Sequence, residues 1–279
     1  MASPLIQTAD LAARLGEPGL RIIDASWHLD GRDGRPDFEV ARLPGAVFFD
    51  LEASSDPDSP LPHMLPSPAF FAARVGGLGV AADDSIVVYD TVGIRSSARA
   101  WWMFRAMGAS DVRVLDGGLP KWLAEGRVIE TGPAAPATAA TFTPSPQPDL
   151  VASIDAVRTA LDAGEQVLDA RAADRFEGRA PEPRAGLPSG HMPGALNLPF
   201  PAILNPDGTM KQGETLAQAF HAAGVDLDRP VVTTCGSGVT AAILSLGLAV
   251  LERPSRLYDG SWAEWGGRAD TQITCAPPG

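Results

Sequence analysis

The sequence contains the same pattern twice, once in each half of the chain. The first copy reads RIIDASW at 21–27, RLPGAVFFDL at 42–51, SIVVYD at 85–90 and VRVLDGGLPKW at 112–122. The second reads QVLDARA at 166–172, GHMPGALNLPF at 190–200, PVVTTC at 230–235 and RLYDGSWAEW at 256–265. Because these segments recur in the same order and at similar spacing, we expect two units of one type. A length of 279 residues agrees with two domains.

A proline-rich stretch, TGPAAPATAATFTPSPQPDL at 131–150, separates the copies. It has five prolines and no charged residue before Asp149, so it holds neither a helix nor a central strand. We therefore predict a first domain at 1–130, a linker at 131–150 and a second domain at 151–279.

Each copy alternates predicted strands with predicted helices. The β-branched runs at 86–89 and 231–234 lack polar alternation, which is typical of strands buried on both faces. The segments at 95–107 and 238–251 are apolar on most of their circumference and are expected to pack as helices against a sheet. This order indicates an α/β fold in which helices flank a mostly parallel sheet.

Composition excludes several classes of partner. The net charge of −12 repels nucleic acid and anionic membrane surfaces. No run reaches the about 20 apolar residues that cross a bilayer, and the start lacks a basic stretch followed by an apolar core. We expect a cytoplasmic protein. Its two cysteines, Cys235 and Cys275, are too few for a disulfide framework or a four-cysteine zinc site, and no metal is expected.

The loop CGSGVT at 235–240 is the strongest candidate site. Cys235 follows a predicted strand at the carboxyl edge of the sheet, where ligands of open α/β folds bind. Backbone N–H groups of such a loop, with a helix N-terminus behind them, stabilise an anionic sulfur or a bound anion. The alternative is a buried, inert cysteine. The first copy has Asp90 at the same place. A carboxylate is no sulfur nucleophile, so only the second copy is expected to be catalytic.

The duplicated layout, the CGSGVT loop, the YDGSWAEW segment and the GHMPGA segment resemble the two-domain rhodanese family, over nearly the whole chain. The fold implied is two tandem rhodanese-like domains. Within the family, the loop resembles that of 3-mercaptopyruvate sulfurtransferases. The resemblance implies that Cys235 carries sulfur as a persulfide and that the first domain is inactive.

The loop also bears on the sulfur donor. Thiosulfate is a dianion, and family members that prefer it generally have basic residues after the cysteine, where this chain has Gly236 and Ser237. A donor with one carboxylate fits an uncharged loop better, which favours 3-mercaptopyruvate. The resemblance marks Arg175 and Arg184 as substrate arginines, since a guanidinium can bind a carboxylate through two hydrogen bonds. The alternative is a solvated, arginine-rich loop.

Three further residues are predicted from the resemblance. His63, in LPHMLP, falls where the family has a histidine that reaches the cysteine loop. The family pairs it with the loop serine, here Ser237, and with an acidic residue that aligns with Glu52. Such a chain relays a proton to the pyruvate enolate as sulfur leaves. The family usually has aspartate where Glu52 stands, and the alternative for His63 is an ordinary surface histidine.

The sequence therefore predicts a sulfurtransferase that moves sulfur from 3-mercaptopyruvate, through a Cys235 persulfide, to a thiol such as thioredoxin or to cyanide. The amides of Gly236, Gly238, Val239 and Thr240 are expected to stabilise the anionic sulfur. No organic cofactor is required. The rivals are a thiosulfate sulfurtransferase and a non-catalytic sulfur carrier or scaffold. A cysteine phosphatase needs an arginine at 241, where this chain has alanine.

Overall fold

The structure, a computed structural model, describes residues 3–275 and divides into two compact units. The first unit takes the described chain up to Asp58, together with Leu65–Gln147 and Asn205–Met210. The second takes Ser59–Met64, Pro148–Leu204 and the described chain from Lys211 onward. Each unit therefore includes one short segment from the other half of the sequence.

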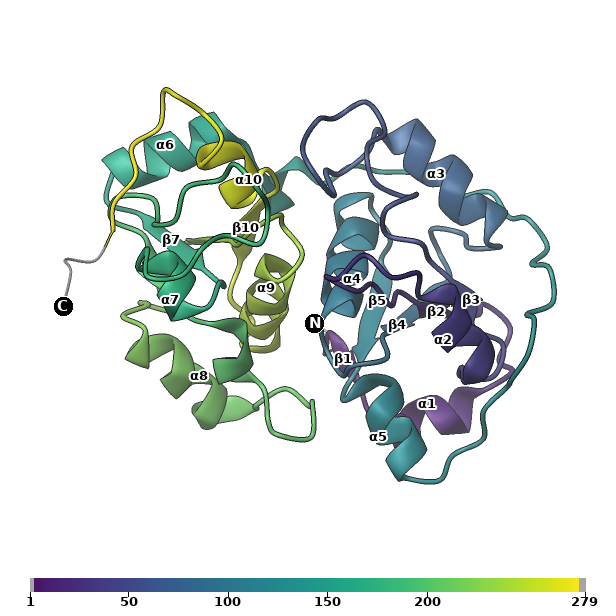
Figure 1. The fold of residues 1–279 in the computed structure, drawn as a ribbon. Helices are drawn as coiled ribbons and strands as arrows, with labels where there is room; N and C mark the ends of the chain where they lie inside the picture. The colour runs from purple at the N-terminus through teal and green to yellow at the C-terminus, as the bar shows by residue number, and fades with distance from the viewer. Residues whose placement is uncertain (1–2, 276–279) are drawn as a thin grey trace. The chain divides into compact units, whose positions relative to one another are not determined.

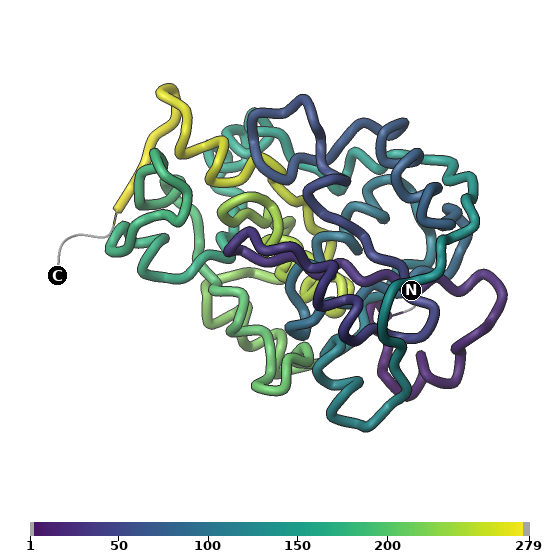
Figure 2. Tube along the Cα trace, turned by 45° about the vertical axis from the view of Figure 1, so that its right-hand side comes forward, coloured from purple at the N-terminus to yellow at the C-terminus, as the bar shows by residue number. Residues whose placement is uncertain are grey.

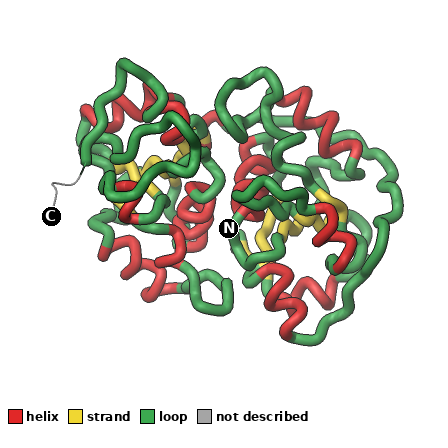
Figure 3. The backbone as a smooth tube through the Cα atoms, in the orientation of Figure 1, coloured by secondary structure: helices red, strands yellow, loops and turns green. Residues whose placement is uncertain are grey.

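The first unit is a parallel sheet with helices on both faces (Figures 1 and 3). Its elements are β1 (Leu5–Ile6), α1 (Thr8–Arg14), β2 (Leu20–Asp24), α2 (Arg35–Val40), β3 (Val47–Phe48), α3 (Pro68–Gly77), β4 (Ser85–Tyr89), α4 (Ser96–Ala106), β5 (Asp111–Leu115) and α5 (Gly118–Ala124). The strand order is β1-β5-β4-β2-β3, with every pair parallel. The predicted strand at 86–89 and the predicted helix at 95–107 are confirmed as β4 and α4.

The two faces of this sheet carry different cores. One holds Leu11 of α1, Phe38 of α2 and Trp122 of α5 against Val87 and Tyr89 of β4. On the other face, α4 packs on β4 and β5. Here the tilted and edge-on rings of Phe49, Phe71, Phe104 and Phe142 lie 5.2–6.5 Å apart. The alternation of side chains along β4 supplies both cores.

The second unit repeats this arrangement. Its elements are η1 (Pro148–Leu150), β6 (Val151–Ala152), α6 (Ile154–Asp162), β7 (Gln166–Asp169), α7 (Ala173–Phe176), β8 (Leu196–Asn197), η2 (Phe200–Ile203), α8 (Gly213–Ala222), β9 (Val231–Thr234), α9 (Ala241–Val250), β10 (Ser255–Tyr258) and α10 (Ser261–Trp265). The strand order β6-β10-β9-β7-β8, again all parallel, matches that of the first unit element for element. The predicted fold class, two similar α/β units, is confirmed.

Helix α9 explains how the carboxyl end of the second sheet is held. It packs against β9 and β10, and its residues from Ala241 to Leu248 are all buried. Gly247 lets it approach η2 and α8, because a Cβ there would lie 2.9 Å from Ile203 and 3.3 Å from Phe220. On the opposite face, Trp262 of α10 packs with Val232 of β9. The start of α9 is therefore fixed from both sides of the sheet.

Residues 131–147 contain no helix or strand (Figure 2), yet the first unit holds them closely. Phe142 is 3% exposed and joins the phenylalanine cluster. The Arg42 side chain donates to the carbonyls of Gly132 and Pro133, and the Ala140 amide donates to the Gly76 carbonyl. The proline-rich segment is thus packed along its length rather than loosely tethered.

Within residues 3–275, no helix has the length and apolar character to cross a membrane.

Candidate active site

Cys235 lies where the sequence places it, at the carboxyl end of β9. The strand ends at Thr234 and α9 begins at Ala241, so the connecting loop spans 235–240. The predicted helix begins three residues later than expected because Gly238 has a φ of +77°, a left-handed conformation that does not continue a helix. Cys235 is 2% exposed, and Ser237 and Val239 are also buried.

The start of α10 orients this loop. The Trp262 amide donates to the Cys235 carbonyl at 2.9 Å, and the Ala263 amide donates to the Gly236 carbonyl at 3.0 Å. In a trans peptide the carbonyl and the following N–H point in opposite directions. The N–H groups of Gly236 and Ser237 therefore face away from α10, which is the orientation that an anion-binding loop needs.

Ser261 adds a third contact to the loop. Its Oγ accepts from the Cys235 amide at 3.3 Å and donates to the Tyr258 carbonyl at 2.8 Å. Ser261 is fully buried and has a φ of +50°, a conformation that costs a residue with a Cβ about 1 kcal/mol. These two hydrogen bonds offset the strain and attach α10 to the backbone of Cys235.

Ser237 and His63 form a pair inside the second unit. His63 Nδ1 and Ser237 Oγ are 3.1 Å apart, and the two residues are 3% and 6% exposed. His63 has a φ of +59°, so its backbone is also strained. A buried, strained histidine on a serine hydroxyl differs from the surface histidine of the alternative interpretation. The pair can hold or pass a proton two residues from the cysteine.

Glu52 belongs to the first unit. There its Oε1 accepts a hydrogen bond from Trp27 Nε1 at 2.7 Å. Its predicted role in orienting His63 stays a prediction.

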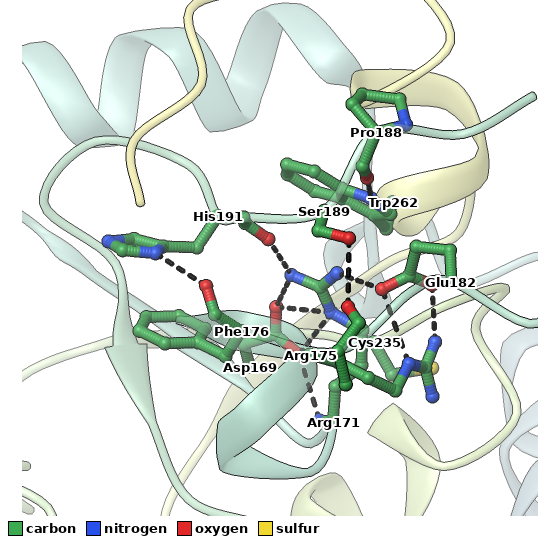
Figure 4. Close-up of polar contacts among 12 residues, drawn as sticks. Asp169, Arg171, Arg175, Phe176, Glu182, Pro188, Ser189, His191, Cys235 and Trp262 are labelled. Atoms are coloured by element: carbon green, nitrogen blue, oxygen red, sulfur yellow. Dashed lines mark hydrogen bonds and ion pairs between the residues drawn. The ribbon is translucent and has the colours of Figure 1, made fainter. Parts of the chain in front are cut away.

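Arg175, in α7, lies beside the cysteine loop (Figure 4). A Cβ built on Gly236 would be 3.2 Å from Arg175 Nη2, so this guanidinium adjoins the residue after Cys235. Glu182 accepts from Arg175 Nε at 3.2 Å and from Nη2 at 2.5 Å. Arg184 lies half-buried in the following loop. Substrate binding by these two arginines stays a prediction.

Sequence reasoning missed a buried network behind Arg175. Arg171 follows β7 and donates to both Asp169 carboxylate oxygens, to Glu182 Oε1 and to the Gly190 carbonyl. Its guanidinium also stacks 4.3 Å from the Trp262 ring centroid. Burial lowers the pKa of Arg171, but the charges and hydrogen bonds of Asp169 and Glu182 outweigh burial and raise it. The only sequence signal was an arginine directly after a buried strand.

The remaining histidines and the second cysteine have contacts outside the loop. His191 stacks on Phe176 at 3.9 Å between centroids and bonds the Phe176 carbonyl. His221 bonds the Val225 carbonyl, and His28 faces Asp37 in the first unit. Cys275 is exposed, and its Sγ lies 3.7 Å from the Ser189 carbonyl. Among the described residues, no group of three or more His, Cys, Asp or Glu side chains could hold a metal.

Comparison with known proteins agrees with this architecture. The rhodanese-like domain model matches twice, at residues 7–125 and 153–268. The chain therefore belongs to the rhodanese family. It is 44% identical to a 3-mercaptopyruvate sulfurtransferase of Rattus norvegicus over 265 residues, covering 93% of this chain and 89% of the relative.

Two further matches cover most of both chains. A thiosulfate sulfurtransferase of Gallus gallus is 42% identical over 265 residues, which is 94% of this chain and 91% of the relative. The crystal structure of SseA from Escherichia coli, described as a 3-mercaptopyruvate sulfotransferase, superposes with a TM-score of 0.85 at 38% identity. That match covers 93% of this chain and 99% of SseA.

Proposed function

We propose that the protein is a 3-mercaptopyruvate sulfurtransferase in which Cys235 is the sulfur carrier. The observation that carries this proposal is the buried Ser237–His63 pair, at 3.1 Å, whose serine lies in the same six-residue loop as Cys235. The relatives from rat and from Escherichia coli bear this enzyme's name at 44% and 41% identity.

The first half-reaction transfers sulfur to the enzyme. The Cys235 thiolate attacks the thiol sulfur of 3-mercaptopyruvate, and the new S–S bond forms as the carbon–sulfur bond breaks. The electron pair of that bond remains on carbon as the pyruvate enolate. A proton from Ser237 completes pyruvate, and His63 returns a proton to Ser237. The products are pyruvate and Cys235 persulfide.

The second half-reaction returns the enzyme to its starting state. An acceptor thiolate attacks the outer sulfur of the persulfide, and the Cys235 thiolate leaves. With a thiol such as that of thioredoxin the product is a new persulfide, and with cyanide it is thiocyanate. The amides of the 235–240 loop stabilise the anionic sulfur in both steps. Arg175 and Arg184 hold the donor's carboxylate.

Thiosulfate is the second candidate donor, because the similar chicken enzyme is named for it. The uncharged positions 236 and 237 favour the monoanionic donor. Initial rates of pyruvate release from 3-mercaptopyruvate and of sulfite release from thiosulfate decide between the two. Cytoplasmic localisation stays a prediction.

Cysteine substitution tests the carrier directly. Cys235→Ser is expected to lower pyruvate release at least about 1,000-fold, because a serine hydroxyl is not ionised near neutral pH and cannot form a persulfide. The matched control is Cys275→Ser, which removes the other thiol and is expected to keep the rate within about twofold. Pyruvate release that survives in Cys235→Ser would refute the proposal.

A further inference from the structure

The buried network behind Arg175 alternates charges. Asp169 and Arg171 pair at 2.6 Å, Arg171 and Glu182 at 2.8 Å, and Glu182 and Arg175 at 2.5 Å. Two carboxylates face two guanidinium groups, so the network has no net charge. Glu182 is the shared member, because its carboxylate accepts from both arginines (Figure 4).

Only one member of the network reaches solvent. The side chains of Asp169, Arg171 and Glu182 are 1–2% exposed, whereas that of Arg175 is 23% exposed. Arg175 also adjoins the cysteine loop through Gly236. A ligand at the loop therefore meets the network at Arg175, with a buried negative charge directly behind that guanidinium.

The geometry of Arg175 restricts how it binds an anion. Its Nε and Nη2 are held by Glu182, while Nη1 makes no hydrogen bond within residues 3–275. The edge that remains is the end of the guanidinium, formed by Nη1 and the second hydrogen of Nη2. That edge matches the two oxygens of one carboxylate.

We propose that Glu182 sets donor preference: it fixes Arg175 for a single carboxylate and cancels its charge, so that monoanionic donors are favoured over dianionic ones. This inference rests on the proposed function. An interaction with a fixed charge is proportional to the charge of the ligand. Thiosulfate has two negative charges, whereas 3-mercaptopyruvate has one at pH 7. Glu182 therefore repels thiosulfate twice as strongly as it repels 3-mercaptopyruvate.

The test is the donor preference of Glu182→Gln. The measured quantity is kcat/KM for thiosulfate divided by kcat/KM for 3-mercaptopyruvate, at pH 7 and low salt with cyanide as acceptor. Removal of one buried negative charge is expected to raise this ratio about tenfold or more. The gain should shrink at 0.5 M salt, since screening weakens interactions with the donor as it approaches.

Two matched variants separate charge from position. Glu177→Gln removes the same charge from a neighbouring position outside the network, where Glu177 pairs with the exposed Arg179, and is expected to leave the ratio within about twofold. Glu182→Asp keeps the charge with a shorter reach. It should raise KM for 3-mercaptopyruvate and for thiosulfate by the same several-fold factor, because Arg175 is held less firmly for either donor, and so leave the ratio unchanged.

An unchanged ratio in Glu182→Gln, or an equal shift in Glu177→Gln, would overturn the inference. If Glu182→Gln does not fold, Glu182→Asp still decides. Raised KM values for both donors at a stable ratio support the inference, whereas a large shift of the ratio, or unchanged KM values, contradicts it. Pyruvate release by the unsubstituted enzyme tests the proposed function separately. A failure there is thus distinguishable from a failure of Glu182 to set preference.

Discussion

The loops at Asp90 and Cys235 occupy the same position in the two units, yet different side chains stand at the two strand ends. The Asp90 carboxylate accepts three backbone hydrogen bonds, from the loop residues Val92 at 3.0 Å and Arg95 at 2.7 Å and from Ser97 in the first turn of α4 at 2.9 Å. Asp90 is fully buried. In the first unit the N–H groups of the loop are therefore occupied by the carboxylate of the protein's own Asp90.

Equivalent backbone contacts hold the two loops. The Leu119 amide donates to the Asp90 carbonyl at 3.0 Å, as Trp262 does to Cys235 at 2.9 Å. Gly118 has a φ of +55° and Ser261 one of +50°, so α5 and α10 each begin with a residue in the left-handed region. The comparison teaches that one supporting geometry can hold either a carboxylate bound by its own loop or a cysteine, the proposed nucleophile. The residue at the strand end decides which.

The largest effect on stability is expected when the Asp90 carboxylate is removed from the first loop. Asp90→Ala leaves one buried and two partly buried N–H groups without their charged acceptor, and we expect a loss of about 3 kcal/mol in the free energy of unfolding. Asp90→Asn keeps one carbonyl acceptor and should lose less. Urea denaturation measures both variants. An Asp90→Ala protein as stable as the parent would show that the carboxylate does not hold the loop.

The carboxylates that end β2 and β7 provide a second comparison. Asp169 is paired with Arg171, whereas Asp24 has Ser26 at the matching position. Burial raises the pKa of Asp24 to about 6, although hydrogen bonds from Ser26 oppose the shift. The folded state therefore favours the protonated acid, and stability falls as the pH rises from about 4 through 6.

Asp24→Asn removes this ionisation without changing the shape of the side chain. Above pH 6 the variant should be more stable than the parent, by up to about 3 kcal/mol. The difference should vanish below about pH 4, where the parent's Asp24 is protonated in both states. Thermal unfolding across pH 4–8 measures it. A difference that is constant over this range would contradict the raised pKa.

The smallest effect concerns Ser261 and its counterpart Gly118. Ser261→Ala keeps the strained φ and loses both hydroxyl hydrogen bonds, whereas Ser261→Gly loses the bonds and relieves the strain. We expect the glycine variant to be about 1 kcal/mol more stable than the alanine variant. Unfolding midpoints compare them. The reverse order would mean that the left-handed turn stores no strain.

Much of the fold and the position of Cys235 follow from local sequence. The β-branched run before Cys235 predicts a buried strand, and the glycines after it predict a tight loop. The repeat then places Asp90 at the equivalent strand end of the first unit. These features are local, so a single segment contains the evidence for each one.

Other parts depend on contacts between distant segments and leave no periodic signal. The pairing of Arg171 with Glu182 joins a strand end to an irregular loop. Residues 59–64 and 205–210 each belong to the unit that the other half of the chain forms. The buried carboxylate of Asp90 was also unforeseen, because an aspartate at a strand end is equally compatible with an exposed loop.

The central claim is that Cys235, alone of the two cysteines, carries sulfur. Its most direct test is peptide mass spectrometry after reaction with one equivalent of 3-mercaptopyruvate and no acceptor. We predict a gain of about 32 Da, the mass of one sulfur atom, on the peptide that contains Cys235. About one equivalent of pyruvate should be released, and cyanide should remove the added mass. Pyruvate release with Cys235 unmodified, or with the sulfur on Cys275 instead, would contradict the account.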